Sequence, residues 1–181
     1  MALSYCWCLP RPRRSNKYPG GFPEHFERRL LELLRLNPYD HNILQPFGGM
    51  AEYGIKLDIK QEPAPDIIGD AHYLPFRDNG FDLVILDPPY SKRDAQVLYS
   101  TPYPNWRRYY QEALRVTRAG GYIVVYQERT PYHVPGTELV YRILVELRTN
   151  HTARIAHVYK KGIARGPAKL VNQYRLGGFY E

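Results

Sequence analysis

The stretch 82–90, DLVILDPPY, limits what this chain can fold into more than any other part of the sequence. Four apolar residues, 83–86, follow one another without a break, as they do in a strand that is buried on both faces of a parallel sheet. The run stops at the turn Asp87-Pro88-Pro89-Tyr90, which places a carboxylate and an aromatic ring after a central strand. Open α/β sheets bind ligands at the carboxyl ends of their strands. The sequence therefore predicts an α/β fold with a site at this strand end.

The two prolines determine what the turn can offer a ligand. Neither has a backbone N–H, so the turn presents carbonyl and carboxylate acceptors with few donors nearby. Such a site suits a substrate that donates hydrogen bonds, for example an exocyclic amino group. The alternative interpretation is a proline-stiffened turn without a ligand.

Three further strands are expected to end in glycine or in an acid. Residues 42–45 lead into Pro46, Phe47, Gly48 and Gly49, residues 54–58 end at Asp58 before Ile59, and residues 66–71 include Asp70 and Ala71. Adjacent glycines let the backbone approach a ligand closely, and a carboxylate at a strand tip can accept both hydroxyls of a ribose. Asp70 can accept from an adenine amino group or only cap a turn. Together these tips predict a nucleoside-binding edge.

In this order, the strand ends resemble those of the class I S-adenosylmethionine-dependent methyltransferases, and in particular the amino-methyltransferases that modify adenine N6 or cytosine N4 in DNA. The resemblance covers about residues 17–160, and DPPY at 87–90 is its most specific element. It implies a Rossmann-like, mostly parallel seven-stranded sheet with helices on both faces. The short spacing between Pro46 and Gly54 predicts a first crossover helix that is shortened to about one turn or missing. Gln45 stands where the family usually has an acid.

The resemblance also implies roles for individual residues. S-adenosylmethionine would be bound by Phe22, Pro46, Phe47, Gly48, Gly49, Asp58, Ile59, Asp70 and Ala71, and the catalytic residues would be Asp87, Pro88, Pro89 and Tyr90. Asp87 and the Pro88 carbonyl would each accept one amino hydrogen and direct the nitrogen lone pair at the methyl group, while Tyr90 would stack on the base. Phe22 has a core-packing alternative.

The function that follows is methyl transfer to an exocyclic amino nitrogen of a nucleobase, with adenine N6 in DNA as the first choice. Three alternatives stay open: guanine N2 in RNA, a small-molecule substrate, and a nucleic-acid-binding module without catalysis. The formal charge of +7 and the 17 tyrosines favour a nucleic acid partner, DNA before RNA, although a basic surface can serve solubility alone. A homodimer is possible.

The rest of the chain predicts a flexible basic arm at 1–17, a catalytic domain at 18–161 and a weakly ordered tail at 162–181. Helices are expected at 23–36 and 105–118, the second ended by Gly120-Gly121, with a mobile loop at 91–104. Strands are expected at 122–126, 139–147 and 153–160, although the second of these can also begin as a helix.

Other function classes find little support in the sequence. No apolar run approaches the roughly 18 residues that span a bilayer, and the first residues lack the apolar segment of a secretory signal, so we expect no membrane partner and a cytoplasmic location. Cys6 and Cys8 can supply half of a zinc site, completed by His25 or another histidine, or can be an inert reduced pair; we assign no metal site.

Overall fold

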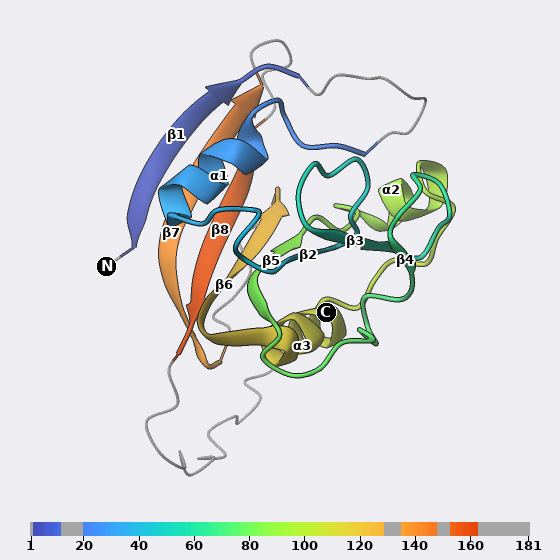
Figure 1. Ribbon diagram of the computed structural model, residues 1–181. Helices are drawn as coiled ribbons and strands as arrows, with labels where there is room; N and C mark the ends of the chain where they lie inside the picture. The colour runs from blue at the N-terminus through green and yellow to red at the C-terminus, as the bar shows by residue number, and fades with distance from the viewer. Residues whose placement is uncertain (1, 12–19, 129–134, 148–152, 163–181) are drawn as a thin grey trace, which may run out of the picture.

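The computed structural model describes residues 2–11, 20–128, 135–147 and 153–162. In this part of the chain one eight-stranded sheet has the order β1-β7-β8-β6-β5-β2-β3-β4 (Figure 1). The strands are β1 (Leu3–Leu9), β2 (Ile43–Pro46), β3 (Ile55–Asp58), β4 (Ile67–Ile68), β5 (Phe81–Leu86), β6 (Thr117–Gln127), β7 (Thr137–Leu147) and β8 (Ala153–Lys161), and the helices are α1 (Phe26–Leu34), α2 (Lys92–Val97) and α3 (Trp106–Val116).

Neighbouring strands of the sheet are mostly parallel. Among the described residues β8 runs antiparallel to both of its neighbours, β6 and β7, and the other neighbouring pairs are parallel. The expected mostly parallel α/β fold is confirmed, with eight strands in place of seven.

The additional strand is β1, which lies in the segment that the sequence assigns to a flexible arm. It pairs in parallel with β7, from Leu3 opposite Tyr141 to Leu9 opposite Leu147, and forms one edge of the sheet. Large side chains at positions 3, 5, 7 and 9 alternate with small ones, but in this strand only Leu9 is buried and Trp7 partly buried, whereas Cys6, Cys8 and the other residues are exposed. The arm prediction is wrong for residues 3–9 because this two-residue period, and not an apolar run, marks the strand. Residues 12–17 and the tail from 163 onward lie outside the described residues.

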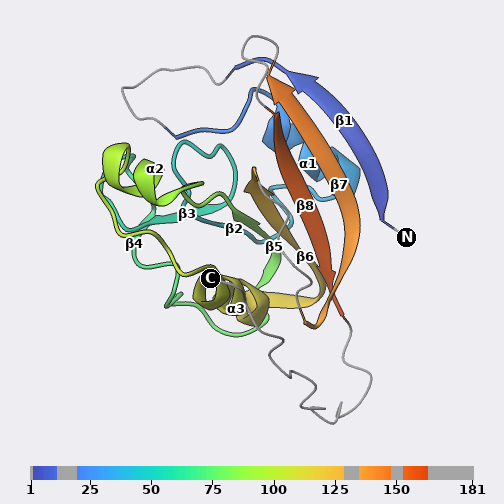
Figure 2. The same ribbon diagram turned by 180° about the vertical axis from the view of Figure 1, so that it is seen from behind.

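The two faces of the sheet are covered by different helices. Strand β5 alternates between them, because Leu83 and Ile85 belong to the apolar cluster that contains α1, whereas Val84 and Leu86 belong to the cluster that contains α3. Helix α1 lies across β7 and β8 in Figure 1 and behind them in Figure 2. The central strand is therefore buried on both faces, as its continuous apolar run predicts.

The first crossover helix, expected to be shortened or missing, is missing, since residues 47–54 between β2 and β3 contain no helix. Two glycines let this loop stay close to the sheet. A Cβ on Gly48 would lie 2.8 Å from both the Gln45 carbonyl oxygen and the Lys56 Cβ, and one on Gly54, where φ is +78°, would lie 2.5 Å from the Ile43 carbonyl oxygen. The glycines thus serve chain packing in this loop.

Two other segments differ from the sequence-based expectations. Part of the predicted loop at 91–104 is helix α2, whose first turn is capped by Ser91 Oγ accepting from the Asp94 N–H at 3.0 Å. Helix α3 ends at Val116 and not at Gly120-Gly121, and β6 begins at Thr117, whose hydroxyl donates to the Ala113 carbonyl at 2.6 Å. The expected hairpin of β7 and β8 is confirmed, so the helical alternative for the start of β7 is wrong.

Candidate cofactor and substrate site

A cleft opens at the carboxyl ends of β2, β3, β4 and β5. It holds about 930 Å³ of empty space, including its open mouth. Ten of the predicted site residues line it: Phe22, Phe47, Gly48, Gly49, Asp58, Ile59, Asp70, Ala71, Asp87 and Pro89. Segments that are far apart in the sequence therefore meet at one edge of the sheet, as the strand ends indicate.

The other three predicted residues, Pro46, Pro88 and Tyr90, are not among the residues that line this cleft. Pro46 is the last residue of β2 and is buried, and Pro88 is buried as well. Tyr90 is partly buried and hydrogen-bonds to Asp87.

Asp58 stands at the end of β3 with 9% of its surface exposed. Its Oδ1 accepts a hydrogen bond from the Lys60 N–H at 3.0 Å. Burial raises the pKa of the Asp58 carboxyl, and hydrogen bonds from the backbone of Lys60, Gly49 and Ile59 oppose that rise. An acceptor in this position can receive the hydroxyls of a sugar.

Asp70 joins the end of β4 to helix α3 through a histidine. Its Oδ1 accepts from the His72 N–H at 2.9 Å and lies 2.6 Å from His72 Nδ1. The Asn105 N–H donates to His72 Nε2 at 2.8 Å, so neutral His72 carries its proton on Nδ1 and donates it to Asp70. Asp70 therefore caps its turn and also lines the cleft. The sequence assigned no role to His72, and only its position two residues after Asp70 points to this contact.

Glu27 holds the loop that follows β2, a role that sequence reasoning missed. This buried carboxylate accepts hydrogen bonds from the Glu52 N–H at 3.0 Å and from Gln45 Nε2 at 2.6 Å, and Gln45 Nε2 also donates to the Tyr53 carbonyl at 2.7 Å. Burial raises the pKa of Glu27, and these hydrogen bonds oppose the rise. The sequence does contain one indication that Glu27 is buried: it precedes Leu31 by one helical turn, on the buried side of α1.

The DPPY turn is linked to strand β8. Tyr90 Oη donates to Asp87 Oδ1 at 2.9 Å, and the guanidinium of Arg154 lies 4.6 Å from the centre of the Tyr90 ring. Arg154 Nη1 also lies 3.0 Å from Glu128 Oε1. Burial raises the pKa of Asp87 to about 7, while the Tyr90 hydrogen bond and the Arg154 charge limit the rise. The carboxyl can thus accept or release a proton near neutral pH.

Residues after α2 form another wall of the cleft, which the sequence assigned only to a loop over the site. Tyr99, Thr101, Pro102, Tyr103 and Pro104 all line the cleft. Burial raises the pKa of Tyr99 to about 12, and the negative charges of Asp87, Asp94 and Asp58 add to this effect. Tyr99 therefore keeps its hydroxyl proton at neutral pH.

Neither a metal centre nor a membrane span is found in the part of the chain that the structure describes. Within it, no three His, Cys, Asp or Glu side chains form a group that could hold a metal ion. Among the described helices, none has the length and apolarity needed to cross a membrane.

Comparison with known proteins gives two kinds of match. A family model described as a methyltransferase domain matches residues 49–125. The phthiotriol/phenolphthiotriol dimycocerosates methyltransferase of Mycobacterium tuberculosis is 40% identical over 72 residues, which are 38% of this chain and 23% of that protein. A related Mycobacterium ulcerans protein is 36% identical over 74 residues, 39% of this chain and 24% of its own length. The chain thus spans about a quarter of the length of these relatives.

Solved structures with the same fold share little sequence with the chain. TrmN from Thermus thermophilus has a TM-score of 0.56 at 18% identity, over 79% of this chain and 50% of that one. The putative methyltransferase yhhF of Escherichia coli has a TM-score of 0.54 at 13% identity, over 85% of this chain and 91% of that one. These similarities support the fold alone.

The residues of the cleft fit S-adenosylmethionine in the chemistry of their polar groups. The Asp58 carboxylate would accept from ribose hydroxyls, the Gly49 backbone would approach the cofactor at the adjoining loop, and Phe47 would provide an apolar surface. Asp58 and Gly49 lie within the matched segment, and Phe47 lies two residues before it. Residues 49–125 thus match a methyltransferase domain, the chain shares its fold with solved structures that include a putative methyltransferase, and the cofactor that this match implies is S-adenosylmethionine.

Proposed function

We propose that the chain transfers a methyl group to an exocyclic amino nitrogen of a nucleobase, with adenine N6 in DNA as the first substrate to test. One observation carries the proposal: Asp87, an acceptor at the end of the central strand, lines the same cleft as Asp58 and Gly49. An amine held by Asp87 would therefore share the cavity with the cofactor.

Asp87 is suited to orient such an amine. Its hydrogen bond with Tyr90 uses Oδ1, so Oδ2 can accept one amino hydrogen while a backbone carbonyl of the turn accepts the other. Both contacts would favour a pyramidal nitrogen whose lone pair points at the methyl donor. Bound S-adenosylmethionine supplies an electrophilic methyl group on sulfur. As the N–C bond forms and the S–C bond breaks, the nitrogen gains positive charge and loses a proton, which a carboxylate with a pKa of about 7 can take.

A base inside a duplex cannot reach this cleft, so it would have to leave the helix or come from a single strand. Flipping costs a few kcal/mol, comparable with the ~1–3 kcal/mol that stacking on an aromatic side chain returns. Tyr99 and Tyr103 line the cleft and could provide such surfaces. Tyr90 is less open, because Arg154 covers one face of its ring.

Guanine N2 in RNA is the closest alternative, since its amino group would make the same hydrogen bonds to Asp87. The test incubates the purified chain with tritiated S-adenosylmethionine and either DNA or RNA, then digests the product and separates its nucleosides by chromatography. We expect label in N6-methyl-2′-deoxyadenosine from DNA. Label in N2-methylguanosine of RNA would instead support the alternative.

A small-molecule substrate is a second candidate, and a specific observation favours it. The mycobacterial relatives, at 40% and 36% identity over their matched segments, are named phthiotriol/phenolphthiotriol dimycocerosates methyltransferases. A phthiotriol dimycocerosate, offered in the same assay, would distinguish this candidate. Label in that acceptor with none in DNA or RNA would replace the nucleobase proposal.

A further inference from the structure

An exposed group of aromatic and basic side chains lies beside the cleft mouth. This surface, here termed the aromatic strip, consists of Tyr73, Tyr103, Trp106, Arg107 and Arg108. Tyr73 is 67% exposed, Tyr103 46% and Trp106 44%, which are large exposures for rings of this size. An apolar surface of this kind on a protein commonly marks a binding site.

The strip is continuous with the cleft. Tyr103 lines both, and His72, another lining residue, binds the Asn105 N–H directly before Trp106. Tyr73 follows His72 in the chain and accepts a hydrogen bond from Arg108 Nη1 at 3.0 Å. A ligand that enters the cleft beside Tyr103 would therefore meet the other strip residues outside it.

The charges of the strip favour an anionic ligand. The guanidinium of Arg107 lies 5.4 Å from the centre of the Trp106 ring, so a cation stands beside an exposed aromatic face. Nearby Glu112 is already paired with Arg115, at 2.7 Å, and Asp78 with the same arginine at 2.8 Å. Both acids are therefore paired with Arg115, and neither ion pair neutralises the positive charge of Arg107 or Arg108.

We propose that the aromatic strip binds single-stranded nucleic acid, with bases stacked on Trp106 and Tyr73 and phosphates on Arg107 and Arg108. The combination of aromatic faces and cations along one path is what sequence-tolerant single-strand binding requires. The two pairs of a ring and a guanidinium, Trp106 with Arg107 and Tyr73 with Arg108, fit bases and phosphates better than they fit a lipid surface. The inference rests on the proposed function and deepens it, because the strip leads a flanking strand to the cleft where the target base is held.

The test measures fluorescence anisotropy of a fluorescein-labelled 12-nucleotide single strand, as DNA and as RNA, titrated with the full chain. Trp106→Ala and Tyr73→Ala should each weaken binding by about fivefold or more, as expected for loss of a stacked base. Arg107→Glu combined with Arg108→Glu should weaken it further and flatten its salt dependence.

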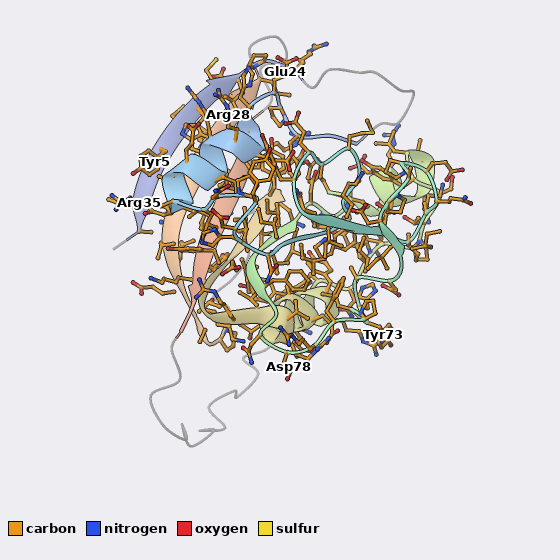
Figure 3. All side chains as sticks on the ribbon, in the orientation of Figure 1. Tyr5, Glu24, Arg28, Arg35, Tyr73 and Asp78 are labelled. Carbon is orange, nitrogen blue, oxygen red and sulfur yellow. The ribbon has the colours of Figure 1, made fainter. Side chains whose placement is uncertain are left out.

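A matched control carries the same change of charge elsewhere. Arg28 and Arg35 are exposed residues in and after α1, and Figure 3 shows them on the opposite side of the molecule from Tyr73. Arg28→Glu combined with Arg35→Glu should reduce affinity much less than the pair in the strip. Equal losses in the two double variants would overturn the inference, because net charge alone would then explain binding.

A second readout reports stacking directly. The chain has two tryptophans, so Trp7→Phe leaves Trp106 as the sole tryptophan. Adding the single strand should quench its fluorescence, because a stacked base quenches indole emission. Absence of quenching at saturating strand, or full affinity in Trp106→Ala, would overturn the inference.

The outcomes also separate this inference from the proposed function. Strip-dependent binding without methyl transfer to any nucleobase would support the strip and contradict the proposed function. Nucleobase methylation at unchanged KM in every variant of the strip would support the proposed function and contradict the role of the strip.

Discussion

The guanidinium of Arg154 covers one face of the Tyr90 ring at 4.6 Å, so β8 contacts the turn that follows β5. Tyr90 in turn donates its hydroxyl hydrogen to Asp87. Arg154, which is remote in sequence, thus joins Tyr90 and Asp87 in one chain of contacts, with Glu128 as the ion-pair partner of Arg154. The arrangement places a positive charge close enough to influence whether Asp87 is ionised.

Arg154→Gln should shift the pH dependence of methyl transfer. Arg154 lowers the pKa of Asp87 against the effect of burial, so its loss should raise that pKa above about 7. If the ionised carboxylate holds the amine, kcat/KM should fall by roughly threefold or more at pH 6 and change less at pH 9. The measurement is a profile of kcat/KM against pH.

Arg154→Lys is the control, because it keeps the charge and loses the planar group over Tyr90. The acid limb of its profile of kcat/KM against pH should stay near that of the parent chain. The charged and titratable groups around the turn, namely Tyr90, Tyr126 and Glu128, are unchanged in both variants. An acid limb that does not move in Arg154→Gln would show that Arg154 has no influence on the titrating group.

Asp87→Asn should stabilise the folded chain at alkaline pH. Burial raises the folded-state pKa of Asp87 from 3.8 to about 7, so the protonated form is favoured in the fold. The resulting stability is fully present below about pH 4 and is lost as the pH rises through about 7. The amide of Asn does not ionise, so the variant does not lose this stability at alkaline pH. It should therefore melt about 2–5 °C above the parent at pH 8.5.

Thermal unfolding followed by circular dichroism at pH 4 and pH 8.5 would test this prediction. The difference between variant and parent should be largest at pH 8.5 and close to zero at pH 4. A variant that melts below the parent at pH 8.5 would contradict the raised pKa.

Glu27→Leu should loosen the loop beside the cofactor. The substitution leaves the Glu52 N–H without its acceptor and leaves Gln45 Nε2 with the Tyr53 carbonyl alone, which costs about 1–3 kcal/mol of folding free energy. Because Gly48 and Gly49 belong to this loop, the affinity for S-adenosylmethionine should fall by roughly tenfold. Calorimetric titration measures the affinity and thermal unfolding the stability.

Glu32→Leu makes the same exchange at an exposed position of α1 and is the matched control. It should leave the affinity for the cofactor at the parent value. Equal affinity in both variants would mean that Glu27 stabilises the fold without positioning the loop.

The parts of the fold that the sequence predicts are those with strong local patterns. The apolar run 83–86 marks a strand that is buried on both faces, and the acids and glycines after each strand mark the edge where the cleft lies. Short elements with weaker patterns are not predicted: β1 has only an alternation of large and small side chains, and α2 has only the cap at Ser91.

Contacts between remote segments are the part of the site that the sequence does not reveal. Glu27 reaches the loop after β2 from a helix, and Arg154 reaches Tyr90 from a strand more than 60 residues away. Nothing in their local patterns indicates these partners, because the contacts arise only once the sheet has set its strand order. Local pattern therefore predicts where the site lies, and the tertiary fold determines which residues tune it.

In the proposed reaction, Asp87 holds the amine that accepts the methyl group. The most direct test of this role compares Asp87→Ala with the parent chain for transfer of tritiated methyl to nucleic acid, alongside calorimetric titration of both with S-adenosylmethionine. Transfer by Asp87→Ala should fall by at least about 100-fold, while its dissociation constant for the cofactor should stay within about threefold of the parent value. Transfer at the parent rate in Asp87→Ala would contradict this role.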